Sequence, residues 1–214
     1  MKVFFNSDYT ASHYAFDTTR KSAEVAKNIP NIHGAEIADP SPFYERTETA
    51  LRDTHDSYYI KAVKTGTPEW VAESQGFTWD EFTYPMVLAH NAGCIAATHE
   101  VLTNNGIVAG TLSSGLHHAR MSKGAGFCTF NGLAVATNEA TRLGAKRILI
   151  LDFDAHCGGG TYSLIGDNVT QVDVSTSSFD GYSIRPNDKS RLIVVDDDDE
   201  YPVSYTHLRA HETL

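Results

Sequence analysis

The longest regular pattern of apolar residues in the chain runs from about Tyr84 to Asn104. Its apolar positions recur at steps of three and four residues, as a helix with one buried face requires. They are Val87, Leu88, Ala92, Ile95, Ala96, Val101 and Leu102. The Asn105-Gly106 pair ends the segment, so the pattern predicts one long helix over 84–104.

Shorter helices are predicted in four other segments, where end signals accompany the pattern. They cover about residues 19–28, 57–64 and 131–143, and a fourth opens at 158–160. The stop signals are residues that end helices: Pro30, Gly66 with Pro68, and Gly144 as a cap. Short apolar runs between the helices predict strands at 3–5, 107–112, 147–151 and 169–174.

The run Ile148-Leu149-Ile150-Leu151 is continuously apolar, which is typical of a strand buried on both faces. Strands and helices alternate from there on, and this order predicts an α/β fold with a parallel sheet. Such sheets carry their functional groups at the carboxyl ends of the strands. We therefore look for chemistry directly after the predicted strands.

Two polar clusters follow predicted strands. The first is Ser113 to Arg120, which contains His117 and His118, and the second begins with the spaced residues Asp152, Asp154 and His156. In extended geometry the side chains of the second cluster point the same way, as half of a divalent metal site would require. The same patterns also occur in caps, turns and structural histidine pairs. A buried carboxylate needs a cation or hydrogen-bond partners, which favours the metal site.

Length and charge limit the class of protein. The 214 residues suffice for one domain with a real core, or for most of a larger one. Seventeen basic and 27 acidic side chains give a net charge of -10, which argues against binding to nucleic acid or to an anionic membrane. Five of the acids form one run at 196–200. The chain shows neither a signal peptide nor a long apolar span, so we expect a cytoplasmic protein.

The three cysteines, Cys94, Cys128 and Cys157, contain no CxxC pair, which argues against a disulfide framework and a zinc ribbon.

Three ordered blocks of the chain resemble the histone deacetylase and acetylpolyamine amidohydrolase superfamily. They are His117-His118-Ala119, Gly126-Phe127-Cys128-Thr129-Phe130-Asn131 and Asp152-x-Asp154-x-His156. Residues 2–5, 55–56 and 74–80 are also similar to bacterial members. The resemblance covers roughly residues 1–195. It implies a three-layer arginase/deacetylase-like α/β fold, with a parallel sheet between helices that is incomplete at the carboxyl end.

The resemblance also implies roles for residues in these blocks. Asp154 and His156 match two of the family's three zinc ligands, and Fe²⁺ suits the same ligand types. The metal would activate a water molecule and polarise the acyl carbonyl. His117 and His118 match the tandem histidines that handle the proton of that water and of the leaving amine. Asp152 matches the carboxylate that orients the first histidine.

Further positions follow from the same resemblance. Asp152, Asp173 and Val174 would contribute to a site for K⁺ or a similar monovalent cation, with Asp173 where the family often has a serine. Gly126 and Phe127 match the wall of a narrow channel that holds an acyl-lysine or acyl-polyamine arm. One departure stands out, because Gly159 occupies the place of an aspartate that would support the second histidine. Cys157, close by, is interpreted as a small core residue rather than a reactive thiol.

The carboxyl end departs from the family pattern as well. Neither a third zinc ligand nor a carbonyl-polarising tyrosine has a match in the chain. Residues 204–213 look like translated sequencing adapter, so we expect residues 1–201 to be the amino-terminal part of one deacetylase-like domain and 202–214 to be a non-native tail. His207 and His211 have helical metal-ligand spacing but belong to this tail. We expect the chain alone to be inactive and to expose apolar surface at an unpaired sheet edge.

The leading functional prediction is zinc-dependent hydrolysis of an acyl-amine amide by metal-activated water. The expected partners are a small acylated amine or an acetyl-lysine peptide, with neither nucleic acid nor membrane, and the sequence leaves the oligomeric state open. An alternative is a metal-containing protein that binds acyl-amines without catalysis, suggested by Gly159. A dimanganese hydrolase of the arginase type is a third possibility, but its pattern lacks the His117-His118 pair.

Overall fold

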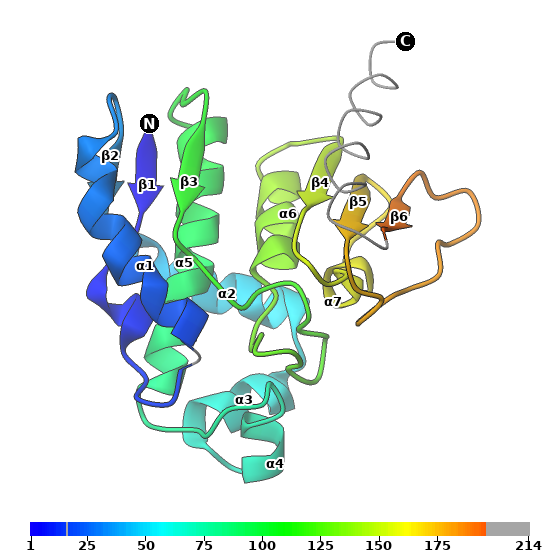
Figure 1. The fold of residues 1–214 in the computed structure, drawn as a ribbon, viewed down its shortest axis with the longest axis horizontal. Helices are drawn as coiled ribbons and strands as arrows, with labels where there is room; N and C mark the ends of the chain where they lie inside the picture. Colours follow the sequence, from blue (N-terminus) through cyan, green and yellow to red (C-terminus); the bar gives the residue numbers. More distant parts are fainter. Residues whose placement is uncertain (16, 196–214) are drawn as a thin grey trace. The chain divides into compact units, whose positions relative to one another are not determined.

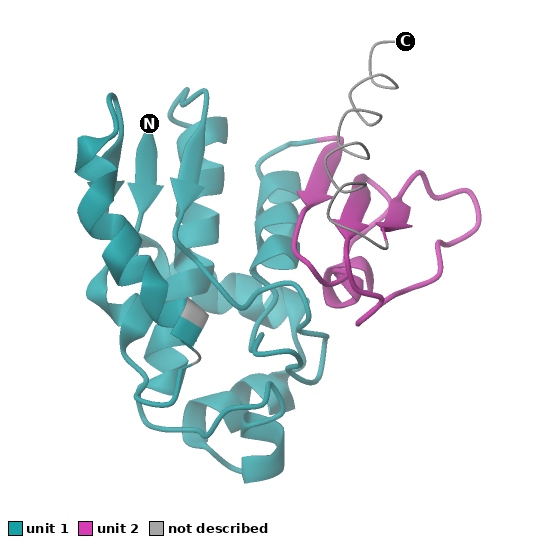
Figure 2. Cartoon of the chain, in the orientation of Figure 1, with its two compact units in different colours: residues 1–145 teal, residues 146–214 magenta. Residues whose placement is uncertain are grey.

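The structure is a computed structural model that describes residues 1–15 and 17–195 of the chain. The chain divides into two compact units, Met1–Ala145 and Lys146–Leu214 (Figures 1 and 2). We describe each unit by itself. The predicted non-native tail at 202–214 lies outside the described residues.

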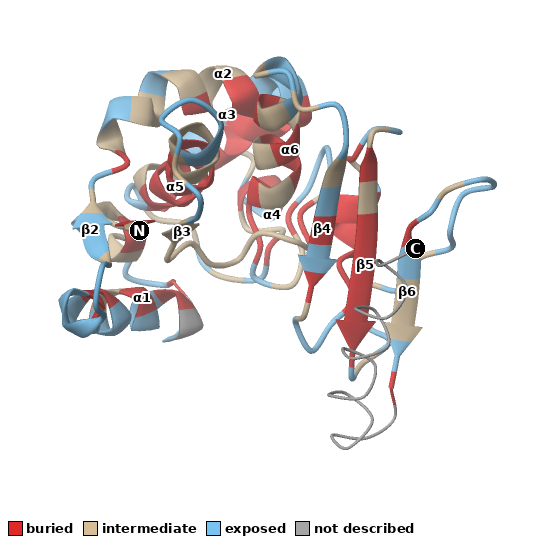
Figure 3. Cartoon of the chain, turned by 90° about the horizontal axis from the view of Figure 1, so that it is seen from above, coloured by how far each residue is buried: buried red, intermediate tan, exposed pale blue. Residues whose placement is uncertain are grey.

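The first unit contains a small parallel sheet. Its strands are β1 (Lys2–Phe4), β2 (Glu36–Ala38) and β3 (Ala109–Thr111), in the order β2-β1-β3. Val3 pairs with Ile37 on one side and with Gly110 on the other. Figure 3 shows the helix α1 (Asp17–Asn28) on one face of this sheet and α5 (Thr83–Leu102) on the other. The parallel α/β layering predicted from the sequence is confirmed.

Helix α5 forms the centre of the first unit. It packs against β1, β3, α2 (Tyr44–Thr54) and α6 (Gly132–Arg142). Every residue from Met86 to Ala96 is buried, so the prediction of a single buried face is wrong for the middle of the helix. The reason is that the sheet and two helices cover it from several sides. Its last turn differs, because Val101 and Leu102 are exposed.

Two further helices complete the first unit, α3 (Ser57–Thr65) and α4 (Glu69–Ala72). The Asp56 carboxylate caps α3 by accepting hydrogen bonds from the backbone of its first turn. Gly66 ends α3, as the sequence predicted, and it adopts the left-handed conformation with φ of 70°. Short 3₁₀ helices cover Ser7–Thr10, Ile29–Asn31 and Ser41–Phe43.

The second unit contains another parallel sheet. Its elements in chain order are β4 (Ile148–Asp152), α7 (Gly159–Tyr162), β5 (Val169–Ser175) and β6 (Arg191–Val194). The strand order is β4-β5-β6, and Asp152 pairs with Asp173 across β4 and β5. The central strand β5 is buried along nearly its whole length (Figure 3).

Strand β4 corrects one expectation. Leu149 and Leu151 are 47% and 46% exposed, so β4 is not buried on both faces. Within the described residues β4 pairs only with β5, and its alternate side chains face away from the covered side. Leu149 and Leu151 thus expose apolar surface on one face of β4, and the unpaired edge expected at the carboxyl end stays a prediction.

All predicted elements occur, with ends shifted by no more than two residues. The elements β2, α2, α4 and β6 were not predicted. All three cysteines, Cys94, Cys128 and Cys157, are buried as thiols. No helix within residues 1–15 and 17–195 has the length and apolar character needed to cross a bilayer.

Candidate active site

The loop between β3 and α6 carries the tandem histidines, and we call residues 112–131 the histidine loop. The rings of His117 and His118 lie against each other, with 3.9 Å between their centroids and a 41° angle between their planes. His118 is buried and His117 is partly exposed. The loop follows the carboxyl end of a parallel strand, which is where such sheets place functional groups.

The turn at Gly126 and Phe127 shapes the surroundings of His118. Both residues are in the left-handed region, with φ of 49° and 62°, and a Cβ added to Gly126 would stand 2.3 Å from Cδ2 of His118. The Phe127 backbone N–H donates to the Gln75 carbonyl at 2.8 Å, while its ring is 42% exposed. Gly126 therefore lies against the His118 ring, and the part of Gly126 and Phe127 in a substrate channel stays a prediction.

Asn131 holds the histidine loop from its far end. Its side-chain oxygen accepts from the Ala134 N–H and caps α6. Its side-chain amide donates to the carbonyl oxygens of His117, at 3.2 Å, and Ala119, at 2.9 Å. The side chain is completely buried. It thus joins the start of α6 to the backbone of the histidine pair.

The second polar cluster lies in the second unit, where β4 ends. The Asp154 N–H donates to Oδ1 of Asp152 at 3.1 Å, and the His156 N–H donates to Oδ1 of Asp154 at 2.9 Å. The expectation of extended geometry is wrong, because residues 154–156 form bends closed by these hydrogen bonds. The bends still bring Nδ1 of His156 to 3.2 Å from Oδ1 of Asp154.

These two side chains fit part of a metal site. Their donor atoms converge, and the side chains of Asp154 and His156 are 51% and 48% exposed. One carboxylate oxygen and one imidazole nitrogen are ligands that suit Zn²⁺ or Fe²⁺. In the described part of the chain, no group of three His, Cys, Asp or Glu residues is placed to hold a metal ion. The described residues thus offer Asp154 and His156 as two candidate ligands.

Two further carboxylates lie side by side on β4 and β5. Asp173 pairs with Asp152 across the strands, and both are buried. The Gly158 N–H and the Gln171 side-chain amide donate to Asp173 at 2.7 Å and 2.8 Å. Burial raises the pKa of Asp173, and these hydrogen bonds oppose that shift. Val174 is completely buried beside it. Buried carboxylates of this kind favour a neighbouring cation, and the monovalent-cation site stays a prediction.

Comparison with known proteins identifies the family of this chain. Residues 17–186 match the sequence profile of the histone deacetylase domain. The chain belongs to the histone deacetylase family. An uncharacterized protein of Picosynechococcus is 35% identical over 122 residues, covering 56% of this chain and 40% of that protein. Acetoin utilization protein AcuC of Bacillus subtilis is 31% identical over 165 residues, covering 72% of this chain and 41% of that protein.

Solved structures agree on the histone deacetylase fold. An acetylpolyamine aminohydrolase from Burkholderia pseudomallei matches with a TM-score of 0.70 and 19% identity, over 83% of this chain and 64% of that one. The HDA15 HD domain matches with a TM-score of 0.64 and 19% identity, over 82% of this chain and 54% of that one. Of the two sequence relatives described above, the chain covers only 40% and 41% of the length.

Asp180 lies beside Gly159, the position where the family often has an aspartate, and the sequence analysis missed this residue. A Cβ on Gly159 would stand 2.2 Å from the Asp180 carbonyl oxygen and 2.8 Å from Asp180 Oδ1. Asp180 also accepts from the Gly160 N–H at 3.0 Å and has φ of 58°. The space for a side chain at residue 159 is therefore filled, and a carboxylate from a later segment lies beside it.

Phe179 is a second residue that the sequence analysis missed. Its ring meets that of His156 edge to face, with 5.5 Å between centroids, and it is 52% exposed. The signal available in the sequence was its place, four residues after β5 ends at Ser175. An exposed aromatic ring next to a candidate metal ligand marks this strand-end loop as part of the candidate site.

Proposed function

We propose that the protein containing this chain is a metal-dependent amidohydrolase that cleaves the amide between a short acyl group and an amine. The observation that carries the proposal is the convergence of Asp154 Oδ1 and His156 Nδ1 at 3.2 Å on an exposed turn. Membership of the histone deacetylase family supports it. Acetyl-lysine peptides, acetylated polyamines and similar small acylated amines are the proposed substrates.

The proposal divides the chemistry among named residues. Asp154 and His156 would hold Zn²⁺ or Fe²⁺, which supplies water activation and polarisation of the acyl carbonyl when bound. Asp152 fixes the backbone of Asp154 through the hydrogen bond from the Asp154 N–H. His117 and His118 would accept a proton at a ring nitrogen and return it to the leaving amine.

Other residues would bind rather than react. The exposed side chain of Phe127 would offer an apolar wall for the arm that carries the acyl-amine, and Gly126, the residue before it, lies against the His118 ring. Asp152, Asp173 and Val174 would contribute to holding K⁺ or a similar cation. Such a cation would offset the two buried carboxylates.

The alternative is a protein that binds acyl-amines and a metal without catalysis. Its motivation was the absence of an aspartate at Gly159. The carboxylate of Asp180 lies beside Gly159, which weakens that motivation. A binder would retain its acylated ligand unchanged, whereas an enzyme would release acetate and be inhibited by a hydroxamate.

The first test is to read the source gene beyond codon 201. A downstream aspartate in a strand-end loop would provide the third metal ligand. A tyrosine in a later glycine-rich turn would provide the group that polarises the substrate carbonyl. The complete protein is expected to release acetate from acetyl-lysine peptide or acetylated polyamine in the presence of Zn²⁺. Metal-loaded complete protein that binds these compounds but releases no acetate would favour the binder instead.

The chain of 214 residues provides a second test. We propose that it is inactive alone, because two ligands hold a metal weakly. Titration with Zn²⁺ is expected to show weak binding that Asp154→Asn removes. Asp167→Asn, which changes an acid outside the cluster, is the matched control. A normal enzymatic rate of deacetylation by the isolated chain would contradict the proposed inactivity.

A further inference from the structure

Two buried histidines of the first unit take no part in the proposed chemistry. His55 follows the last residue of α2 and is 4% exposed, and His90 lies in the middle of α5 and is 2% exposed. Buried imidazoles need defined partners for both ring nitrogens. In both cases one or more partners belong to the histidine loop.

His90 contacts the start of the loop. Its Nδ1 accepts from the Ser114 N–H at 3.1 Å, so this nitrogen carries no proton. Its Nε2 lies 3.0 Å from the Tyr9 carbonyl oxygen, which only accepts, so Nε2 carries the proton. The Ser113 hydroxyl adds a hydrogen bond to the His90 carbonyl at 2.6 Å. The contacts assign one tautomer, the Nε2–H form.

His55 contacts the other end of the loop, with the roles of its nitrogens reversed. Its Nε2 accepts from the Asn131 N–H at 3.0 Å. Its Nδ1 lies 2.9 Å from the carbonyl oxygen of Arg120, two residues after His118. The Nδ1–H tautomer is therefore the form that satisfies both contacts.

Neither ring can take up a second proton without losing a hydrogen bond from a backbone N–H. A charged ring would point an N–H at the backbone N–H of Ser114 or of Asn131, and two donors repel. Burial works in the same direction, since it disfavours the charged form and lowers the pKa of His55 and of His90 to about 4. Both rings are thus uncharged at neutral pH.

The contacts reach the tandem histidines through a short path. Asn131, whose N–H is held by His55, donates from its side chain to the carbonyls of His117 and Ala119. His55 therefore holds the segment that follows His118 directly, through Arg120, and the His117 backbone through Asn131. His90 holds the chain three residues before His117, at Ser114.

We propose that His55 and His90 are positioning residues for the His117-His118 pair, and that they act as uncharged rings of opposite tautomer at the two ends of the histidine loop. The functional part of this inference rests on the proposed role of His117 and His118 in proton transfer. The structural part stands on the hydrogen bonds alone.

The first experiment determines the tautomers in the chain of 214 residues. Two-bond ¹H–¹⁵N spectra at pH 7 are expected to show the protonated nitrogen at Nδ1 in His55 and at Nε2 in His90. Amide hydrogen exchange is expected to show protection of the Ser114 and Asn131 N–H groups. The reverse tautomer in either ring, or unprotected amides, would overturn the proposal without any need for activity.

The second experiment uses paired variants of His55. His55→Phe keeps a ring of similar shape without nitrogens, and His55→Gln retains a side-chain oxygen that reaches toward the Asn131 N–H. We expect His55→Phe to speed exchange of the Asn131 amide by about tenfold and to shift the ring proton resonances of His117 and His118. His55→Gln is expected to restore much of both.

A purely structural role gives a different result. The variant His55→Phe would then lower the free energy of unfolding while the His117 and His118 resonances of the folded protein stayed in place. That outcome would refute positioning. If His55→Phe does not fold, His90→Asn tests the same idea at the other end, because its side-chain oxygen retains the acceptor for Ser114 and is expected to leave the Ser114 amide protected.

The complete protein separates this inference from the proposed function. His55→Phe is expected to lower kcat with little change in KM, since it displaces groups that act on the bound substrate. Absence of any hydrolysis by the unmodified complete protein would defeat the proposed function, while the tautomers and the His117 and His118 resonances would still decide the positioning role.

Discussion

The imidazole ring of His118 lies directly against the backbone of Gly126. A Cβ at residue 126 would stand 2.3 Å from Cδ2 of the ring, and the backbone there has φ of 49°. Glycine is therefore required for two separate reasons, the close approach and the left-handed conformation. Gly126, which the family resemblance places in the wall of a substrate channel, therefore also limits where the ring of His118 can lie.

Gly126→Ala is expected to displace the His118 ring and to lower the free energy of unfolding by about 2–3 kcal/mol, as the sum of strain and overpacking. Urea unfolding and the His118 ring resonances would measure the two effects. Gly34→Ala is the control for strain alone, because Gly34 has φ of 75° and no atom within 4 Å of the added Cβ. We expect it to cost about 1 kcal/mol. Equal effects of the two substitutions would contradict the close contact.

Gly159→Asp would restore the aspartate that the family resemblance leads one to expect. We expect it to destabilise the chain by about 2 kcal/mol or more, because its Cβ would lie 2.2 Å from the Asp180 carbonyl oxygen. Urea unfolding would show the change. Gly166→Ala serves as the control, since its Cβ would approach only Asn168 Oδ1, at 3.3 Å. A stable Gly159→Asp variant would mean that the segment around Asp180 moves away at little cost.

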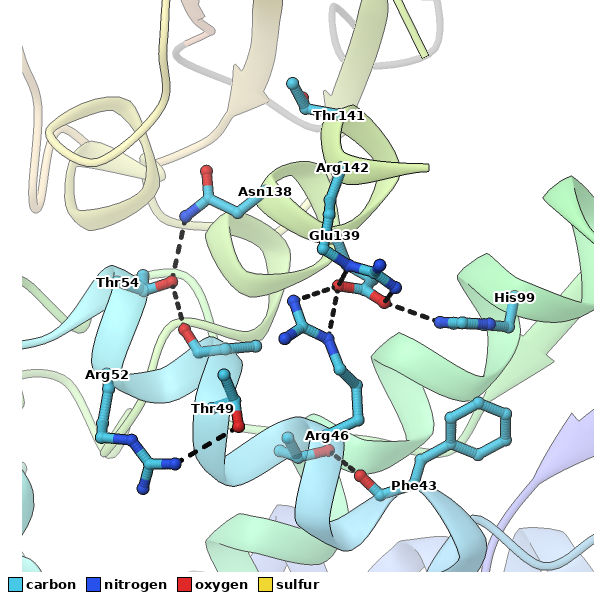
Figure 4. A network of polar contacts seen from close by, with 12 residues as sticks. Phe43, Arg46, Thr49, Arg52, Thr54, His99, Asn138, Glu139, Thr141 and Arg142 are labelled. Carbon is cyan, nitrogen blue, oxygen red and sulfur yellow. Dashed lines mark hydrogen bonds and ion pairs between the residues drawn. The ribbon is translucent and has the colours of Figure 1, made fainter. Parts of the chain in front are cut away.

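Glu139 is a fully buried carboxylate that joins three helices of the first unit (Figure 4). Arg46 of α2 and Arg142 of α6 donate to it at 2.5–2.9 Å, and His99 of α5 lies 2.6 Å away. Burial alone would raise the pKa of Glu139, but the hydrogen bonds from Arg142, Arg46 and His99 outweigh it and hold the pKa far below its usual range. The carboxylate therefore stays ionised.

Glu139→Gln is expected to lower the free energy of unfolding by about 2–3 kcal/mol, less than for a fully enclosed pair because Arg46 and Arg142 are partly exposed to water. Chemical denaturation at pH 7 measures it. Glu48→Gln, at a partly exposed carboxylate that contacts Lys64, is the control and should cost no more than about 1 kcal/mol. Losses of the same size would show that the Glu139 network adds nothing beyond a surface pair.

The pH dependence of stability follows from His55 and His90. Their pKa values are lowered by burial from about 6.5 to about 4, so between these values the unfolded chain binds more protons than the folded one. The contribution of each ring is thus complete above about pH 6.5 and is lost as the pH falls toward 4. It amounts to roughly 3 kcal/mol per ring.

Urea unfolding at a series of pH values between 7 and 4.5 would test this dependence. The slope of stability against pH is expected to decrease in His90→Asn, since that variant lacks one of the two imidazoles. His33→Gln, which removes an exposed imidazole, is the control and is expected to retain the slope of the unmodified chain. An unchanged slope in His90→Asn would show that His90 is not held uncharged.

In the complete protein, His117→Ala is expected to remove most turnover while the metal remains bound. Asp154→Ala should lose both, because it removes a proposed metal ligand rather than a proton carrier. Acetate release and metal content measured on the same samples distinguish the two. Full activity of the His117 variant would contradict its role in proton transfer.

The sequence predicted several elements because their signals are local. The helix at Ser57–Thr65 is followed by Gly66 and Pro68, the stop signals behind its prediction, so its bounds were nearly correct. The strand at Glu36–Ala38 was missed because three largely exposed residues carry no periodic pattern. Only its pairing with β1, more than 30 residues away in the chain, makes it a strand.

The candidate site shows the same division. The spacing of Asp152, Asp154 and His156 was readable from the sequence, and so was the His117-His118 pair. The sequence did not show that bends rather than an extended strand join Asp154 to His156, because the hydrogen bonds of two aspartates decide that conformation. The carboxylate of Asp180 beside Gly159 was equally hidden, since a close approach between residues 21 apart leaves no local pattern.

The sequence by itself determined the fold class, the family and the residue types of the candidate site, because these follow from periodicity and from short motifs. Tertiary structure alone decided which residues hold those motifs in place. His55 meets Arg120 and Asn131, and His90 meets Tyr9 and Ser114, across separations of 24 to 81 residues. The sequence shows a histidine but not which ring nitrogen carries the proton. Backbone partners that are far away along the chain and in direct contact in the fold select the tautomer.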